Sequence, residues 1–297
     1  VPYWQLNLWL EKDNVRFRAV WVAAEQYCDA EKRCVNVQAA TSVQSQCRQA
    51  GVAVVREVSS KREKTPPPLC FSLGTLQEVC SKKFGLGAQA VLDIAQSLYE
   101  KHKATTYPRT DCGYLPVSMH KEVPEVLAAV ANTDPDIAPE LAKLSPDIVS
   151  RVWNDKKITA HHAIIPTRQA FNIGALSDNE LRVYRLIRQH YLAQFLPVQE
   201  ADVTEATFVV AGQLFGTRGR VEVVKGWRAL FIADAPHDED EGGDTEQTMP
   251  LPVLAKGDEC RLVEAELKEM KTTPPRHYTE GTLIAAMKNA AGMVSDP

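Results

Sequence analysis

The sequence lacks several features that would assign it quickly. It has no net positive charge, because 34 Lys and Arg stand against 38 Asp and Glu. No apolar run approaches the roughly 20 residues that a membrane-spanning helix needs, so no membrane segment is expected. Residues 1–7 have neither an initiator Met nor the pattern of a signal or transit peptide. We therefore expect a cytoplasmic protein, and a chain that is part of a longer one.

The seven cysteines include no C-x-x-C pair, and their number is odd. A zinc site and a disulfide framework are both disfavoured by this spacing. Scattered free thiols are typical of a reducing compartment.

The formal net charge of −4 is unusual for a nucleic-acid-binding protein, which is generally basic. However, residues 234–246 hold seven acidic residues and no Lys or Arg. Without that segment, which is typical of a solvated loop, the chain carries +3. The composition therefore permits DNA binding without favouring it.

The chain begins with strand patterns. Apolar residues alternate through residues 4–10 and 15–21 around a polar turn, which predicts a β-hairpin. Residues 36–50 predict a helix closed by Gly51, and residues 51–59 a Val-rich strand. Residues 61–64 are charged, and residues 65–68, Thr-Pro-Pro-Pro, predict a stiff extended linker that marks a domain boundary.

Helical signals follow the prolines. Ser72 is a good N-cap for a helix to about residue 84, and a second helix fits residues 91–99. Further helices are expected near 121–132 and 140–154. Ser177 and Glu180 form a capping box that opens a helix to about residue 195.

Strand patterns return at residues 203–211, 220–224 and 259–267, and a last helix begins near Thr279. The predicted fold class is α+β, with a β-rich domain split in sequence around a mainly helical insert. The expected parts are 1–66 and 197–272 for the β-rich domain, 67–196 for the helical domain, and 273–297 for the start of a further domain.

The segment around Tyr107 is the first candidate site. Tyr107 precedes Pro108, which disfavours helix at Tyr107 and predicts a loop or strand end. In an extended chain Arg109 and Asp111 share its face. A phenol with a pKa of about 10 needs such a cation to attack phosphorus at neutral pH, and Asp111 could orient Arg109. Packing and surface ion pairs account for the same spacing equally well.

Two further motifs contain polar groups suited to phosphate. His161 and His162 precede an apolar run, and could be phosphate donors, metal ligands or hydrogen-bonded structural residues. Thr279 is a plausible N-cap preceded by Arg276, which together would form an anion site at a helix N-terminus. A plain cap after a proline linker is the alternative for Thr279.

Taken together, these motifs resemble those of the type IA DNA topoisomerases, in particular the bacterial topoisomerase III branch. The resemblance covers nearly the whole chain in the family's order. The matching segments are 92–100, 106–112, 114–116, 161–167 and 274–279.

The resemblance implies roles for individual residues. Tyr107 matches the tyrosine that forms a 5′-phosphotyrosyl link with single-stranded DNA. Arg109 matches an arginine expected to contact the scissile phosphate, and His161 a histidine implicated in the active site. Asp111 matches a nearby acid expected to assist.

Three more residues are implied to bind DNA. Arg276 and Thr279 match a segment expected to touch the DNA backbone. His162 is specific to the topoisomerase III branch, and its role is the least defined.

The family also implies an architecture and a cofactor. Its β-rich domain is an arch, split around the helical domain that bears the tyrosine, and residues 273–297 would begin a DNA-binding domain. Its Mg²⁺ site lies in a TOPRIM domain, expected before residue 1. The expected partners are single-stranded DNA and that missing domain, with the protein a monomer and this piece inactive alone. The alternative function is a non-catalytic single-stranded-DNA-binding, gate or scaffold module.

Overall fold

The computed structural model describes residues 1–158, 160–231, 251–274 and 277–290. The chain forms two compact units, each assembled from separate stretches of sequence. The described parts of the first unit are 1–64, 200–223 and 251–274. Those of the second are 65–158, 160–199, 224–231 and 277–290. Strands dominate the first unit and helices the second, so the chain is of the α+β class.

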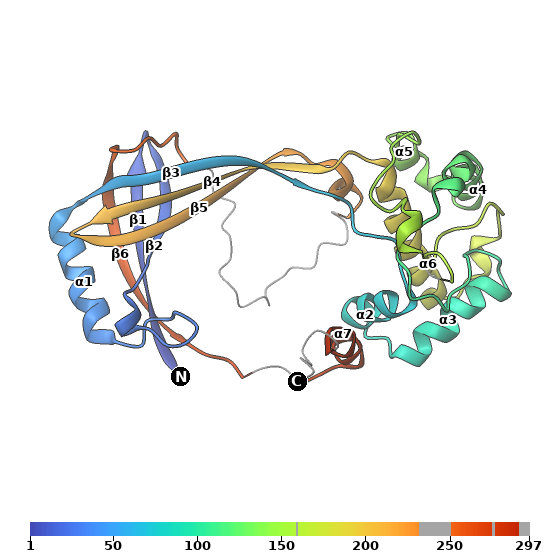
Figure 1. Cartoon of the computed structure of the whole chain (residues 1–297), viewed down its shortest axis with the longest axis horizontal. Helices are drawn as coiled ribbons and strands as arrows, with labels where there is room; N and C mark the ends of the chain where they lie inside the picture. Colours follow the sequence, from blue (N-terminus) through green and yellow to red (C-terminus); the bar gives the residue numbers. More distant parts are fainter. Residues whose placement is uncertain (159, 232–250, 275–276, 291–297) are drawn as a thin grey trace. The chain divides into compact units, whose positions relative to one another are not determined.

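The first unit is built on a closed barrel with the strand order β1-β2-β5-β4-β3-β6 (Figure 1). Its centre is filled by apolar side chains that alternate along the strands, among them Leu8, Phe17 and Phe208. The strands are β1 (Pro2–Lys12), β2 (Val15–Trp21), β3 (Val52–Thr65), β4 (Gln199–Val210), β5 (Gln213–Val224) and β6 (Glu259–Lys271).

The predicted hairpin is confirmed. Lys12 pairs with Val15, which leaves a two-residue turn of Asp13 and Asn14. Both turn residues have positive φ, 50° and 62°, as the hairpin turns that match strand twist require. The predicted helix that follows is α1 (Val37–Ala50), capped by the Asn36 side chain and closed by Gly51 at φ 68°.

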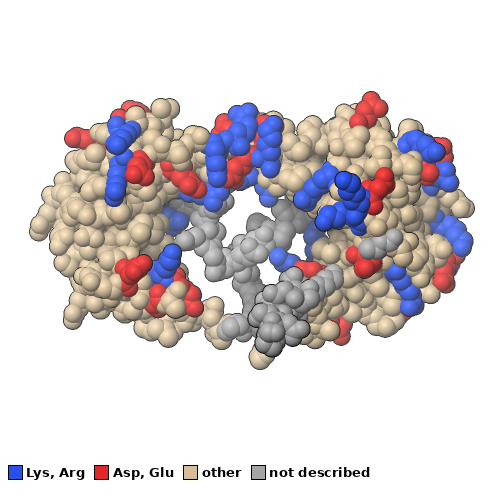
Figure 2. Space-filling view, viewed as in Figure 1, with Lys and Arg blue, Asp and Glu red and all other residues tan. Residues whose placement is uncertain are grey.

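Strand β3 is longer than predicted, since it continues through the charged residues 61–64 to Thr65. The charged side chains of that stretch pair with neighbouring strands: Arg62 with Asp202 at 2.8 Å and Lys64 with Glu200 at 2.9 Å. Basic and acidic side chains accordingly lie next to one another over β3, β4 and β5 (Figure 2). The extension was not predicted because the partners of these charges lie far along the chain.

The second unit contains six helices among its described residues. The Ser72 and Ser177 side chains cap α2 and α6 in capping boxes, as predicted. Helices α2, α3 and α6 share one apolar core that includes Leu76, Leu98 and Tyr184. The helices are α2 (Leu73–Phe84), α3 (Ala88–Glu100), α4 (Val123–Thr133), α5 (Ala138–Leu141), α6 (Asp178–Leu192) and α7 (Glu280–Ala290).

The long helix expected over residues 140–154 does not form, because α5 ends at Leu141. Pro146 lacks a backbone N–H and disfavours helix in the residue before it. The amide of that residue, Ser145, donates instead to the Phe195 carbonyl oxygen at 2.8 Å. Trp153 then pairs with Leu115 in a parallel β-bridge.

No helix of the described residues is both long and apolar enough to span a membrane.

His190 on α6 makes the second unit sensitive to acid. Its ring lies on Phe71 with centroids 4.0 Å apart, and burial lowers its pKa to about 4. The unfolded chain therefore binds a proton that the folded chain excludes as pH falls from about 6.5 to about 4. We expect the stability of this unit to fall in that window by up to about 1.4 kcal/mol per pH unit.

Hydrogen exchange of the α6 amides across this pH range measures the effect, after correction for the intrinsic exchange rate. The variant His190→Gln cannot take up the proton and serves as the control. An equal pH dependence in both proteins would contradict the assignment.

Candidate active site

The Tyr107 loop is held by backbone pairing with the segment that carries the two histidines. Thr105 bridges to Pro166, and the Thr106 amide donates to the Ile165 carbonyl oxygen at 2.9 Å. The Thr106 hydroxyl donates to the Ala163 carbonyl oxygen at 3.1 Å and accepts from the Ile165 amide at 3.0 Å. Two segments about 60 residues apart in sequence are thereby fixed side by side, with Tyr107 at the end of the paired stretch.

Tyr107 lies between two other rings and is accessible. Its ring centroid is 4.8 Å from that of His161, with the planes inclined by 35°, and 5.7 Å from that of Tyr99 in an edge-on contact. It is 38% exposed although it is a large aromatic side chain. The prediction that Tyr107 lies outside a helix is confirmed, and the structure brings Tyr107 and His161 together.

Arg109 is oriented by helix α3. Its Nη2 donates to Gln96 Oε1 at 3.0 Å, and Gln96 Nε2 donates to Glu100 Oε1 at 2.9 Å. The exposed guanidinium is therefore positioned by a neutral side chain. Gln96 is not among the site residues predicted from the sequence. The sequence does place Gln96 three residues before Tyr99, so a helix puts both side chains on one face.

Lys103 adds a second cation close to the aromatic cluster. Its Nζ lies 5.8 Å from the centre of the Tyr99 ring, within the range of a cation–π contact. The Thr167 hydroxyl donates to the Lys103 carbonyl oxygen at 2.6 Å, which ties this turn to the histidine segment. A basic, partly aromatic surface of this kind suits the phosphates and bases of a single strand.

The described residues include no group of three or more His, Cys, Asp or Glu side chains that could hold a metal ion. All seven cysteines are free thiols. His161 and His162 therefore belong to no such group within the described part of the chain.

Comparison with known proteins places the chain. Residues 1–292 match the family model described as DNA topoisomerase. The chain belongs to this family. It is 40% identical over 284 residues to DNA topoisomerase 3 of Salmonella typhimurium, an alignment that covers 95% of the chain and 42% of that protein. It is 38% identical to DNA topoisomerase 3 of Vibrio cholerae, covering 94% of the chain and 42% of the relative.

This topoisomerase-family chain therefore spans about 42% of the length of these curated relatives. Full-length topoisomerase I from Thermotoga maritima has a similar fold, with a TM-score of 0.65 over 97% of this chain and 44% of the other. At 20% identity that likeness concerns the fold alone.

The remaining predicted site residues of this topoisomerase-family chain lie in different settings. Asp111 is exposed, and its ion pair with Arg109 stays a prediction. His162 is partly buried, with Nδ1 2.8 Å from the Ala163 carbonyl oxygen, a contact that fits the structural alternative. Thr279 is exposed and caps α7, since its hydroxyl accepts from the Thr282 amide at 3.2 Å. Arg276 lies outside the described residues.

Proposed function

We propose that this chain is the tyrosine-bearing part of a type IA DNA topoisomerase that cuts and rejoins single-stranded DNA, with Tyr107 as the nucleophile. The observation that carries the proposal is the exposed Tyr107 ring, packed against His161 in a loop whose arginine is oriented from α3. The family membership of the chain supports the reaction class.

In the proposed reaction the Tyr107 oxygen attacks phosphorus and loses its proton. A bond forms between that oxygen and phosphorus, and the bond from phosphorus to the 3′ oxygen breaks, leaving a free 3′ hydroxyl and a 5′-phosphotyrosyl link. Arg109 would stabilise the negative charge that develops on the phosphate oxygens. His161 would donate to the phosphate or assist the leaving oxygen. Attack by the 3′ hydroxyl reverses the step and restores both bonds.

Mg²⁺ belongs to the proposal only for the whole enzyme, where a TOPRIM domain outside this chain would hold it. When bound, the ion would neutralise phosphate charge. The described residues of this chain do not fit a metal site, so no step above depends on one. We propose accordingly that the 297-residue chain alone does not relax supercoiled DNA, and relaxation by it would contradict this point.

The nucleophile can be identified directly. A protein that combines this chain with its missing part is incubated with a single-stranded oligonucleotide, denatured and digested, and the peptide linked to DNA is identified by mass spectrometry. We expect the DNA on the peptide that contains Tyr107. A link to another residue would disprove the assignment, and DNA binding without any link would favour the non-catalytic module.

The orientation of Arg109 by Gln96 has a measurable consequence. In the same protein Gln96→Ala should slow formation of the covalent link about 3- to 10-fold, because one hydrogen bond contributes about 1 kcal/mol. Gln89→Ala is a matched control, since Gln89 lies on the same helix and bonds Asp93 at 2.8 Å with the same spacing. Equal rates in the two variants would show that Gln96 does not position Arg109.

A further inference from the structure

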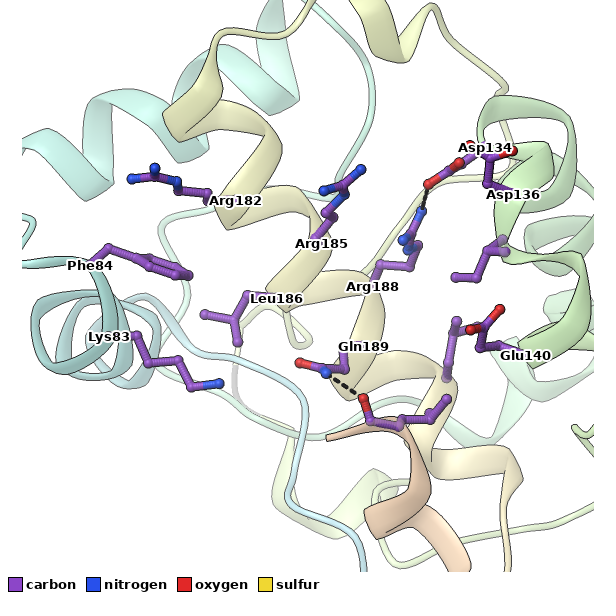
Figure 3. A pocket seen from close by; sticks show the side chains of 13 residues that line it. Lys83, Phe84, Asp134, Asp136, Glu140, Arg182, Arg185, Leu186, Arg188 and Gln189 are labelled. Carbon is purple, nitrogen blue, oxygen red and sulfur yellow. Dashed lines mark hydrogen bonds and ion pairs between the residues drawn. The ribbon is translucent and has the colours of Figure 1, made fainter. Parts of the chain in front are cut away.

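The helical unit contains a polar cavity whose lining is separate from the Tyr107 loop. Its volume is about 420 Å³, and it lies between α6, the end of α2 and the segment around α5 (Figure 3). This is within the size range of small-molecule sites. None of the residues assigned to the Tyr107 site lines it.

One side of the cavity is basic. Arg182 and Arg185 are three residues apart on α6, so they project from neighbouring positions of one face (Figure 3). Both are exposed, and neither has a hydrogen-bond or ion-pair partner among the described residues. Lys83 lines the same cavity. Two neighbouring guanidinium groups with no internal acid suit a phosphate, which accepts several hydrogen bonds at once.

Arg188, by contrast, is already satisfied. Its Nη1 donates to Asp134 Oδ2 at 2.6 Å, and both side chains are buried. This pair therefore forms a rigid, nearly neutral part of the wall. The charge that a ligand meets on α6 comes from Arg182 and Arg185.

The facing side is acidic and incompletely satisfied. Glu140 lines the cavity, and its Oε2 is buried without a hydrogen-bond partner among the described residues. A buried carboxylate oxygen without a donor destabilises the folded state. A ligand that presents an N–H group to Glu140 would remove that cost.

Next to the arginines the lining is apolar. Phe84 and Leu186 lie next to one another below Arg182 and Arg185 in Figure 3. An aromatic ring beside a branched aliphatic side chain suits a flat heterocycle, since bases stack on such surfaces whatever their identity.

We propose that this cavity binds one nucleotide of single-stranded DNA, with its phosphate on Arg182 and Arg185 and an amino group of its base donating to Glu140. Cytosine has such an amino group and thymine does not, so cytosine should be preferred. The choice of DNA rests on the proposed function. The recognition chemistry would suit a free nucleotide as well, and the experiment separates the two.

The test measures binding of fluorescently labelled dC10 and dT10 to the 297-residue chain by anisotropy at several salt concentrations. The double variant Arg182→Gln, Arg185→Gln should weaken binding of both strands at least about 10-fold. It should also reduce the salt slope by about 0.7, the value for one phosphate contact on a single strand. Glu140→Gln should remove the preference for dC10. The control, Arg16→Gln with Arg261→Gln, removes the same charge from exposed ion pairs of the barrel unit.

Equal losses in the control and in the Arg182, Arg185 variant would overturn the proposal, as would an unchanged dC10 preference in Glu140→Gln. Displacement of labelled dC10 by dCMP, dTMP and inorganic phosphate identifies the source. Stronger displacement by unlabelled dC10 than by dCMP supports a strand, and stronger displacement by dCMP shows a free-nucleotide site instead. Phosphate as effective as dCMP would show a simple anion site.

The two proposals fail separately. A DNA link on Tyr107 together with unchanged binding by the Arg182, Arg185 variant would overturn the cavity alone. Weakened binding by that variant, with a link on some other residue, would overturn the role of Tyr107 and leave the cavity as proposed.

Discussion

Replacement of Tyr107 by phenylalanine is expected to abolish the covalent protein–DNA link, by at least about 10³-fold, in a protein that contains the whole enzyme. The substitution removes only the attacking oxygen, and a reaction that depends on one nucleophile loses several orders of magnitude without it. The phenyl ring retains the contacts with Tyr99 and His161. The local fold of the loop should therefore persist, and non-covalent DNA binding should change little.

The measurement uses a single-stranded oligonucleotide labelled at its 3′ end, because a 5′-phosphotyrosyl link retains the 3′ portion on the protein. The labelled band that survives denaturation is quantified. Tyr114→Phe is the control, since Tyr114 lies in the same loop and its hydroxyl has no partner among the described residues. A persistent labelled band in Tyr107→Phe would rule out Tyr107 as the nucleophile.

Replacement of Arg188 by methionine is expected to destabilise the helical unit by about 3–5 kcal/mol. The Arg188 and Asp134 side chains are only 10% and 11% exposed, and they are joined at 2.6 Å. Removal of the guanidinium leaves the Asp134 carboxylate buried without its counter-charge. Most of the expected loss of stability comes from burying the unpaired Asp134 carboxylate, not from losing its attraction to Arg188.

Denaturant unfolding followed by far-ultraviolet circular dichroism measures this loss. The double variant Arg188→Met, Asp134→Asn removes both charges and should recover at least half of it. If the single and double variants were equally unstable, the loss would arise from packing, since Arg188 also lies 5.7 Å from the Tyr184 ring. If the single variant were as stable as the parent, the pair would not be needed for folding.

The parts of the fold that could be predicted depend on neighbours in sequence. Asn36, Ser72 and Ser177 cap helices through their own side chains and the next turn, so their helices were correctly placed. The extension of β3 could not be predicted, because Arg62 and Lys64 are held by acids about 140 residues away. The helix wrongly expected over 140–154 shows the same limit, with Ser145 bonded to Phe195.

Some features of the candidate site could likewise be predicted from the sequence, and others could not. The resemblance to type IA topoisomerases is confirmed at the level of the family. The proximity of Tyr107 and His161 depends on hydrogen bonds between two separate segments, which local spacing does not reveal. The neutral partner of Arg109 was missed because glutamine on a helix surface is common. The roles of Arg109, Asp111 and His161 in catalysis stay predictions.

The pairing of the Tyr107 loop with the histidine segment also bears on mechanical force. A DNA end linked to Tyr107 would pull on the loop that begins at Thr105 and Thr106. Those residues are joined to Pro166 by a bridge, and to Ala163 and Ile165 by three hydrogen bonds of Thr106. Tension on the linked strand would thus be shared between two chain segments, and His161 would stay in register with Tyr107 while the break is open.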